Sequence, residues 1–365
     1  MVVGLVETAV PTAKSTISSV VKKPTFLSSD PIINVARGDP TIYEPYWKKM
    51  GDRCKVVIVG DEFMSYFCNT MNLCWFLLPE LDNAIRTLHR VVGNAMVDDD
   101  RFIIVGNGST QLFHALLYAL SSPDLPEPIN VVAAAPFFSS YPEETKFLQS
   151  KLYKWAGDAN CYDKDEPYIE VVTSPNNPDG SIRGTVVNRG SKAIHDLAYY
   201  WPQYAPITSK ADHDAMLFTF SKATGHAGTR IGQSDRRKFI EVSSIGVSRE
   251  AQLRAAKILG VIADDCRNPD HKGENLFQYG RRLMSERWGK LREVGMKSNA
   301  FAWLKSKEGL NCENLLRDKS KIITRGGPSF GVDSTYTRVS MLSRDVEFEL
   351  LLERLAAIKG TVNGN

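Results

Sequence analysis

The stretch Thr219-Phe220-Ser221-Lys222, followed by Arg230-Ile231-Gly232, decides how this chain is interpreted. It comes at the end of an apolar run, Ala215 to Phe220, that has the composition of a buried strand. A lone lysine after a strand is usually a solvated residue. Here hydroxyl side chains stand beside the lysine, and an arginine follows eight positions later. Because the guanidinium group binds phosphate oxygens two at a time, the combination indicates a phosphate-bearing ligand.

Lysine, hydroxyls and arginine in this order are typical of pyridoxal-phosphate (PLP) enzymes of the aspartate-aminotransferase type. In these enzymes the lysine amine bonds to the cofactor aldehyde, while the hydroxyls and the arginine bind its phosphate. Such a cofactor makes further demands on the chain. Its phosphate needs backbone N–H groups at a helix start. Its ring nitrogen needs a carboxylate that keeps it protonated.

The sequence meets each demand directly after a predicted strand. Gly108-Ser109-Thr110-Gln111 ends a strand and opens a helix, which suits a phosphate. Asn177, in the turn Ser174 to Gly180, can donate its amide to the phenolic oxygen of the ring. Asp196 can face the ring nitrogen, and Tyr199 can reach the phenolic oxygen. Since ligands collect beyond the carboxyl ends of parallel strands, the order of these weak signals makes them jointly strong.

Apolar strands alternate with helical stretches through the first two thirds of the chain, which predicts an α/β domain with a largely parallel sheet. The predicted strands are Arg101–Val105, Asn130–Ala135, Tyr168–Thr173, Lys192–Tyr199 and Ala215–Phe220, and the predicted helices are Pro79–Val92 and Gln111–Leu120.

From about Val247 the pattern changes to long helices and a smaller α+β domain. Helices are predicted at Ser248–Asp264, Leu276–Val294 and Val346–Ile358, and strands at Ala300–Leu304 and Thr337–Met341. We therefore expect a mobile tail at 1–33 and an N-terminal segment at 34–60 that packs on the small domain. A large PLP-binding domain follows at 61–265, and the small C-terminal domain occupies 266–365.

The composition of the 365 residues excludes several classes of protein. Lys and Arg number 45 and Asp and Glu 42, so the net charge of +3 gives no field that attracts nucleic acid or an anionic membrane. No stretch approaches the roughly 20 apolar residues that span a bilayer. The six cysteines are scattered without a metal-binding pattern, so we expect free thiols, no metal and a cytoplasmic protein.

Longer stretches extend the likeness to a particular family. The chain resembles the plant tryptophan aminotransferases that make indole-3-pyruvate for auxin (indole-3-acetic acid) biosynthesis, which are related to the alliinases. The resemblance covers roughly residues 35–355. The matching stretches are Arg37–Thr41, Tyr46–Cys54, Met64–Phe67, Asn72–Phe76, Ala133–Phe137, Thr173–Gly180, His195–Pro202, Asp212–Gly232 and Arg338–Arg344.

The resemblance implies a fold type I aminotransferase with PLP as cofactor, which converts L-tryptophan and pyruvate to indole-3-pyruvate and L-alanine. It implies that Lys222 is the catalytic lysine and that Arg338 binds the substrate carboxylate. Tyr66 resembles a tyrosine that reaches the phosphate of the neighbouring subunit, which implies a homodimer with shared active sites. The cofactor-binding set is Tyr66, Ser109, Thr110, Asn177, Asp196, Tyr199, Thr219, Ser221, Lys222 and Arg230.

The chain departs from the family at three places. After Gly232, where the family continues with an aromatic residue and an apolar strand, stand Gln233 to Lys238, all polar or charged. Burying six polar or charged side chains in an inner strand costs much free energy. We therefore expect a large sheet that lacks this strand. A second shortening lies near Lys297 to Ala300. The stretch from Val187 to Ala193 is also more compact than its counterpart in the family.

Three alternatives to a tryptophan aminotransferase stay open at this point. The first is another aromatic amino-acid aminotransferase, because aromatic residues such as Tyr46, Trp47 and Phe137 do not identify the ring that is bound. The second is an alliinase-like carbon–sulfur lyase, which shares the cofactor site. The third is a catalytically impaired, truncated homologue that acts as a binding partner.

Overall fold

The computed structural model describes residues 31–71, 74–98, 101–187, 192–234, 239, 243–268, 273–292, 300–306 and 309–362. Most of the predicted tail, the polar run from Asp235 to Lys238 and the shortened stretch before Ala300 lie outside these residues. The same holds for residues 188–191 and for Asn72 and Leu73. The domain boundaries expected from the sequence stay predictions.

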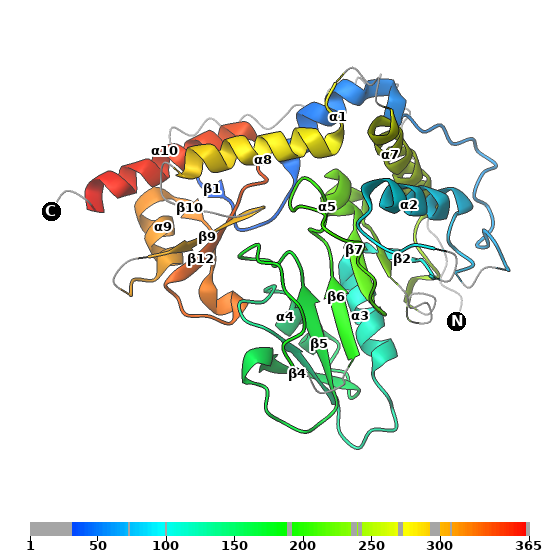
Figure 1. Ribbon diagram of the computed structural model, residues 1–365, viewed down its shortest axis with the longest axis horizontal. Coiled ribbons are helices and arrows are strands. Elements are labelled where there is room, and N and C mark those ends of the chain that lie inside the picture. The colour runs from blue at the N-terminus through cyan, green and yellow to red at the C-terminus, as the bar shows by residue number, and fades with distance from the viewer. Residues whose placement is uncertain are drawn as a thin grey trace, which may run out of the picture. The chain divides into compact units, whose positions relative to one another are not determined.

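A seven-stranded sheet forms the centre of the large domain (Figure 1), in the order β2-β8-β7-β6-β5-β3-β4. Neighbouring strands from β7 to β4 are parallel, whereas β8 is antiparallel to both β2 and β7. The strands β3, β5 and β7 are buried along their whole length, as strands covered on both faces must be. The predicted α/β fold with a mainly parallel sheet is confirmed. The strands are β2 (Ile104–Asn107), β3 (Ile129–Ala133), β4 (Tyr153–Asp158), β5 (Tyr168–Thr173), β6 (Lys192–Asp196), β7 (Met216–Thr219) and β8 (Ile231–Ser234).

The strand that the sequence put in doubt, β8, is present, so the expectation of a missing strand is wrong. Gly232 pairs with Thr219 of β7 on one side and with Gly106 of β2 on the other. The polar Gln233 is accommodated because its amide nitrogen lies 2.8 Å from Nε2 of the buried His89. A hydrogen-bonded polar side chain costs far less on burial than an unpartnered one.

Helices cover the sheet and connect its strands. α2 (Pro79–Val92) and α7 (Arg249–Arg267) lie side by side (Figure 1). α2 begins at a proline, ends before Gly93 in a left-handed conformation and buries Leu81, Ile85 and Leu88 on one face. Three shorter helices follow strands of the sheet: α3 (Gly108–Leu120), α4 (Tyr141–Phe147) and α5 (Phe220–Thr224).

The C-terminal part is built on a three-stranded antiparallel sheet, in the order β11-β12-β9. α8 and α10 lie side by side along it (Figure 1), joined by the ion pair between Arg287 and Asp345. β1 pairs with β10, which joins the start of the described chain to this part. The elements are β1 (Ile33–Asn34), α1 (Glu44–Met50), α8 (Leu276–Arg292), β9 (Phe301–Lys305), α9 (Cys312–Ser320), β10 (Ile322–Ile323), β11 (Arg325–Gly326), β12 (Tyr336–Ser340) and α10 (Asp345–Val362), and short 3₁₀ turns are η1 (Thr41–Tyr43), η2 (Gly51–Cys54), η3 (Ala159–Cys161), η4 (Ala227–Thr229) and η5 (Gly327–Phe330).

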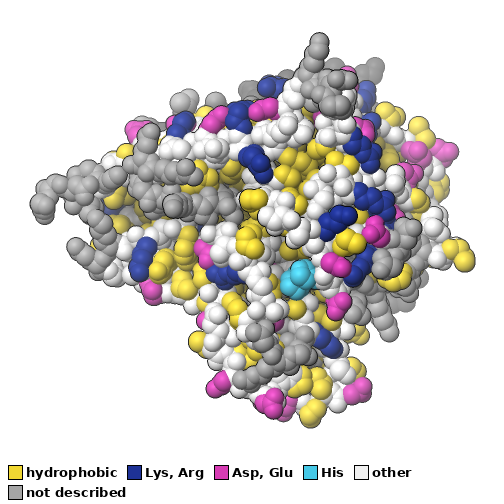
Figure 2. All heavy atoms as spheres, viewed as in Figure 1, with side chains coloured by type: hydrophobic (Ala, Val, Ile, Leu, Met, Phe, Trp, Pro, Cys, Tyr) yellow, Lys and Arg dark blue, Asp and Glu magenta, His cyan; other side chains and the backbone are white. Residues whose placement is uncertain are grey.

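The surface agrees with the balanced composition. Basic and acidic side chains are interspersed on the face shown in Figure 2. Within the described ranges, no helix combines the length and the apolar character that crossing a bilayer requires.

Candidate active site

The candidate site lies where several strands of the large sheet end. β6 ends at Asp196, β7 ends at Thr219 just before α5, and β2 ends at Asn107 just before α3. Because β5, β6 and β7 are parallel, their carboxyl ends meet at one edge of the sheet, where open α/β folds bind ligands. The predicted site residues at the ends of β5, β6 and β7 are therefore brought together.

Lys222 lies in the middle of the short helix α5 (Phe220–Thr224). The Thr219 hydroxyl accepts the N–H of Ser221 at 3.3 Å and so caps this helix, which ends at Gly225 with a φ of 86°. The Lys222 ammonium group donates to the carbonyl oxygen of Gly38 and lies 5.8 Å from the centre of the Tyr199 ring. Burial, followed by the charge of Arg338, lowers the pKa of Lys222 to about 8. At pH 7 roughly one Lys222 amine in ten is then neutral and able to act as a nucleophile, against about one in several thousand for a lysine of ordinary pKa.

The start of α3 and the side chain of Arg230 form a cradle that suits a phosphate. A Cβ on Gly108, whose φ is +77°, would lie 2.2 Å from an Arg230 guanidinium nitrogen. A Cβ on Gly232 would lie 2.9 Å from the backbone nitrogen of Ser109. Only glycine lets β8 and the arginine approach the helix start this closely. Backbone N–H groups, two hydroxyls and a guanidinium group thus point to one anion site.

Asp196 is a buried carboxylate held by two hydrogen bonds. It accepts the hydroxyl of Tyr141 at 2.7 Å and the N–H of Ala198 at 3.1 Å. The Tyr141 hydroxyl also lies 2.6 Å from that of Thr173. Burial raises the pKa of Asp196, while these hydrogen bonds oppose the rise. A buried carboxylate is favoured by a cationic partner, and a protonated ring nitrogen is such a partner.

Tyr199 is buried beside Lys222, and its phenol keeps its proton. Burial raises the pKa of Tyr199 well above the usual value, with Tyr204 as the next cause. The hydroxyl is therefore a hydrogen-bond donor throughout the physiological range, as the phenolic oxygen of the cofactor requires.

Arg338 is 3% exposed and packs near two aromatic rings, with its guanidinium carbon 4.4 Å from the centre of Phe301 and 5.1 Å from that of Phe330. It donates to Oδ1 of Asn177 at 2.8 Å and to the carbonyl of Ala36, whereas its Nε has no partner among the described residues. Burial lowers the pKa of Arg338 to about 10, which still leaves it charged at neutral pH. A buried cation that has no counter-anion among the described residues suits a carboxylate ligand.

The contact with Arg338 also orients Asn177. A guanidinium group has donors only, so the side-chain oxygen of Asn177 faces it and the amide NH₂ points the other way. That NH₂ is the group expected to donate to the cofactor.

Tyr66 does not join the other predicted residues. It is 71% exposed, in the segment between α1 and α2. Its predicted role needs a second copy of the chain, so its place on the surface leaves the prediction open.

Residues that sequence reasoning missed also line the site. Gly38 holds the Lys222 amine, Tyr141 holds Asp196, and Glu144 contacts Thr110 at 3.3 Å. Tyr141 and Glu144 belong to α4, which follows β3 at the same edge of the sheet. Their position after a buried strand was the one signal that could have found them.

Comparison with known proteins identifies the family. The sequence model described as allinase matches residues 33–302 and 294–359. The chain belongs to the alliinase family. Tryptophan aminotransferase-related protein 2 of Arabidopsis thaliana is 49% identical over 90% of this chain and 82% of its own length. The protein of the same name in rice (Oryza sativa subsp. japonica) is 47% identical, over 91% of this chain and 75% of its own. Alliin lyase 1 of garlic (Allium sativum) is 35% identical, over 87% of this chain and 73% of its own length.

Solved structures show the same fold. The aromatic aminotransferase of Pyrococcus horikoshii matches with a TM-score of 0.64 and 18% identity, covering 90% of this chain and 96% of its own. The aspartate aminotransferase of Thermotoga maritima matches with a TM-score of 0.63 and 15% identity, covering 90% and 92%. This member of the alliinase family thus has the fold type I aminotransferase architecture.

The cofactor of this family member is pyridoxal 5′-phosphate, and the chain is a PLP-dependent enzyme by family and fold. Its own residues fit that group. The glycine-lined cradle at α3 suits the phosphate, buried Asp196 suits the ring nitrogen, and the buried amine of Lys222 suits the aldehyde.

Proposed function

We propose that this enzyme transfers the amino group of L-tryptophan to pyruvate, forming indole-3-pyruvate and L-alanine in auxin biosynthesis. Its similarity to tryptophan aminotransferase-related proteins, at 47% to 49% identity, supports the substrate. The observation that carries this proposal is a low-pKa amine at Lys222 together with a buried guanidinium group at Arg338, whose Nε has no hydrogen-bond partner among the described residues. An α-amino acid presents an α-proton and a carboxylate, and these two side chains suit those two groups.

Arg338 binds and orients the substrate in this proposal. The α-carboxylate binds beside the neutral acceptors, the Asn177 amide oxygen and the Ala36 carbonyl, and it supplies the missing counter-charge. The rings of Phe301 and Phe330, packed near the guanidinium group, exclude water, which strengthens the ion pair.

The remaining residues manage protons. PLP, when bound, withdraws electrons from the substrate carbon through its ring. Asp196 keeps the ring nitrogen protonated, because a buried anion favours a cation beside it. Lys222, once displaced by the substrate amine, accepts the α-proton as a neutral general base, since its pKa of about 8 lies near the working pH.

The first experiment compares Lys222→Ala with Lys210→Ala, an exposed lysine outside the site. The wild type and Lys210→Ala are expected to be purified as yellow proteins whose absorbance shifts on titration with L-tryptophan. Lys222→Ala should show neither that spectral response nor turnover. Wild-type protein that stays colourless after adding PLP would support the inert homologue instead.

The second experiment separates transamination from carbon–sulfur lysis. Enzyme incubated with L-tryptophan and pyruvate should accumulate indole-3-pyruvate and alanine. Enzyme incubated with an alkyl-cysteine sulfoxide should release little pyruvate. The reverse result would assign the chain to lyase chemistry, and faster turnover of phenylalanine or tyrosine would change the substrate.

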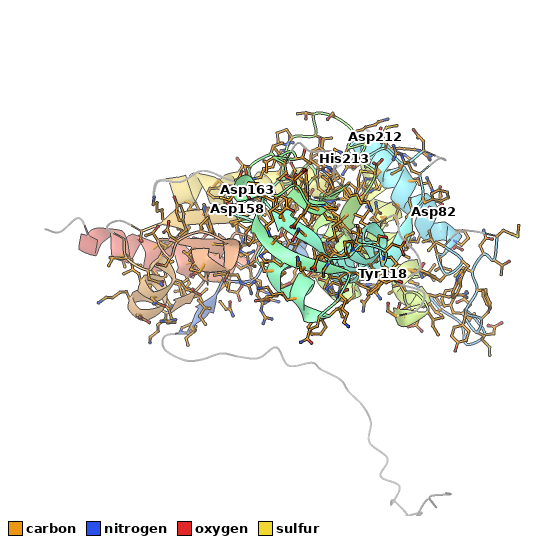
Figure 3. The ribbon with its side chains drawn as sticks, turned by 90° about the horizontal axis from the view of Figure 1, so that it is seen from below. Asp82, Tyr118, Asp158, Asp163, Asp212 and His213 are labelled. Carbon is orange, nitrogen blue, oxygen red and sulfur yellow. The ribbon has the colours of Figure 1, made fainter. Side chains whose placement is uncertain are left out.

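We also propose a homodimer with shared active sites. The segment that carries Tyr66 exposes several large apolar side chains, among them Met64 at 84% and Phe67 at 55%, which a partner surface would cover. Light scattering should give twice the mass of one chain. Tyr66→Phe should weaken PLP binding, whereas Tyr118→Phe, a 43% exposed tyrosine on α3 (Figure 3), should not. A monomer that binds PLP fully would contradict this arrangement.

The reaction is placed in the cytoplasm in this proposal. Five of the six cysteines, Cys54, Cys68, Cys161, Cys266 and Cys312, are free thiols, as is typical of proteins in a reducing compartment. A fluorescent fusion found in a secretory or organellar compartment would contradict it.

A further inference from the structure

Glu144 of α4 lies against the phosphate cradle without belonging to the predicted site. Its Oε1 accepts the hydroxyl of Thr110, the third residue of α3, at 3.3 Å. The ring of His114 lies 3.0 Å from the Glu144 carbonyl oxygen, which fixes α4 against α3. The carboxyl group is therefore held at the edge of the place where the phosphate is expected.

This contact conflicts with the role of Thr110. A hydroxyl group has one proton and two lone pairs, and an ionised carboxylate can only accept. While Glu144 is ionised it takes the proton of Thr110, so only lone pairs remain for the phosphate. A phosphate dianion can also only accept hydrogen bonds, and its binding would place two negative charges, its own and that of the Glu144 carboxylate, close together. A protonated Glu144 removes both problems, because it donates to Thr110 and frees the hydroxyl proton for the phosphate.

The groups around Glu144 favour uptake of a proton. Burial raises its pKa to about 7, helped by Asp196 at the end of β6 and by Glu143 on its own helix, and the Thr110 hydrogen bond opposes the rise. His114 on α3 contributes no charge, because burial lowers its pKa. On β4, the charged Lys154 pairs with Glu127 at 3.7 Å. A bound phosphate dianion beside the carboxyl group raises its pKa further, so Glu144 is protonated in the complex.

We propose that binding of a phosphate group at the start of α3 transfers one proton from water to Glu144, so that Thr110 donates its hydroxyl proton to the phosphate. The inference rests on the site binding PLP. It makes cofactor affinity dependent on pH through a side chain that does not touch the reacting atoms.

Calorimetry on the full chain without cofactor tests this directly. The probe is pyridoxamine 5′-phosphate, which carries the phosphate and lacks the aldehyde that Lys222 would attack. Titrations at pH 8 in two buffers of different ionisation enthalpy give the number of protons taken up. The wild type should take up close to one proton more per site than Glu144→Gln. The control Glu353→Gln, at an exposed glutamate on α10, should behave as the wild type.

The pH dependence of affinity provides the second readout. Between pH 8 and 9 the dissociation constant of the wild type should rise up to tenfold more than that of Glu144→Gln, because each bound proton contributes one power of ten per pH unit. Thr110→Val, which removes the hydroxyl at similar volume, should take up less than the wild type, because the hydrogen bond that favours ionised Glu144 before the ligand binds is gone.

Equal proton uptake in the wild type and Glu144→Gln would overturn the inference, as would full uptake in Thr110→Val. Either result leaves the proposed function intact as long as PLP binds and colours the wild type. Failure of the wild type to bind either form of the cofactor would overturn both.

Discussion

Among single residues, Arg338 makes the most specific demand on a ligand. Its flat guanidinium group packs near the rings of Phe301 and Phe330 and can bind a carboxylate through two N–H groups at once, which a lysine ammonium group does not reproduce. Arg338→Lys should therefore lose about 2 kcal/mol of carboxylate binding, which raises the KM for tryptophan roughly thirtyfold. Steady-state kinetics measures this, with PLP absorbance as the check on cofactor binding. Arg344→Lys, in an exposed pair with Glu44, is the matched control and should change KM little. An unchanged KM in Arg338→Lys would remove this residue from carboxylate recognition.

Lys222 gives a second prediction at the same scale. Only the neutral amine attacks an aldehyde, and burial together with Arg338 lowers the pKa of Lys222 to about 8. The rate at which protein without cofactor captures PLP should rise with pH and level off above about pH 8. Stopped-flow absorbance follows it, and Arg338→Met should move the midpoint upward by removing a repelling charge. A capture rate that still climbs beyond pH 10 would mean an ordinary lysine.

Residue types at strand ends made most of the site predictable. Lys222, Asp196 and Thr110 each follow a strand, so sequence order alone placed them at one edge of the sheet. Glu144 also follows a strand, because α4 comes after β3, but its helix is too short to be recognised from a helical period. Gly38 comes from the N-terminal segment, and only tertiary packing brings that segment to the strand ends.

Among the elements, β8 shows how a strand tolerates a polar residue. Gln233 bonds to His89, whose other ring nitrogen lies 2.7 Å from Asn94 Oδ1. Gln233→Leu should cost about 1 to 2 kcal/mol of unfolding free energy, because it leaves a buried ring nitrogen unpartnered. A cavity of about 30 Å³ beside Gln233 and His89 leaves room for the leucine.

A double-mutant cycle in urea isolates that contact. In the His89→Phe background the same Gln233→Leu change should cost little, since both polar partners are then apolar. Equal costs in the two backgrounds would show that the hydrogen bond does not stabilise β8.

Element boundaries were predicted well where a pattern was long. The periodic apolar face fixed α2 at Pro79–Val92, and the apolar run fixed β5 at Tyr168–Thr173. β2 begins at Ile104 rather than Arg101, because its pairing with β8 spans Ile104 to Asn107. α4 was missed since seven residues opening with Tyr141-Pro142 are too few to show a helical period.

For the whole molecule, buried histidines make the fold sensitive to acid. Burial lowers the pKa of His89, His195 and His226 to about 4, and the stacked ring of His213, 3.5 Å from that of His195, adds to the effect. His213 lies next to Asp212 in the loop before β7 (Figure 3). Glu144 and Asp196, whose pKa values burial raises, act in the opposite direction and stabilise the fold as the pH falls.

The contribution of one histidine can be separated by comparing variants. A folded-state pKa below the unfolded value of about 6.5 means that the unfolded chain binds more protons as the pH falls, so stability is present above pH 6.5 and is lost toward the folded-state pKa of about 4. For His89 this amounts to about 2 kcal/mol between pH 6.5 and 5. Urea unfolding should therefore show that His89→Phe, though less stable at pH 7, loses about 2 kcal/mol less than the wild type over that interval. The opposing carboxyl groups are the same in both proteins and cancel in the difference. Parallel loss in the two proteins would mean that His89 is already protonated in the fold, and hence that its contacts with Asn94 and Gln233 hold an imidazolium ion.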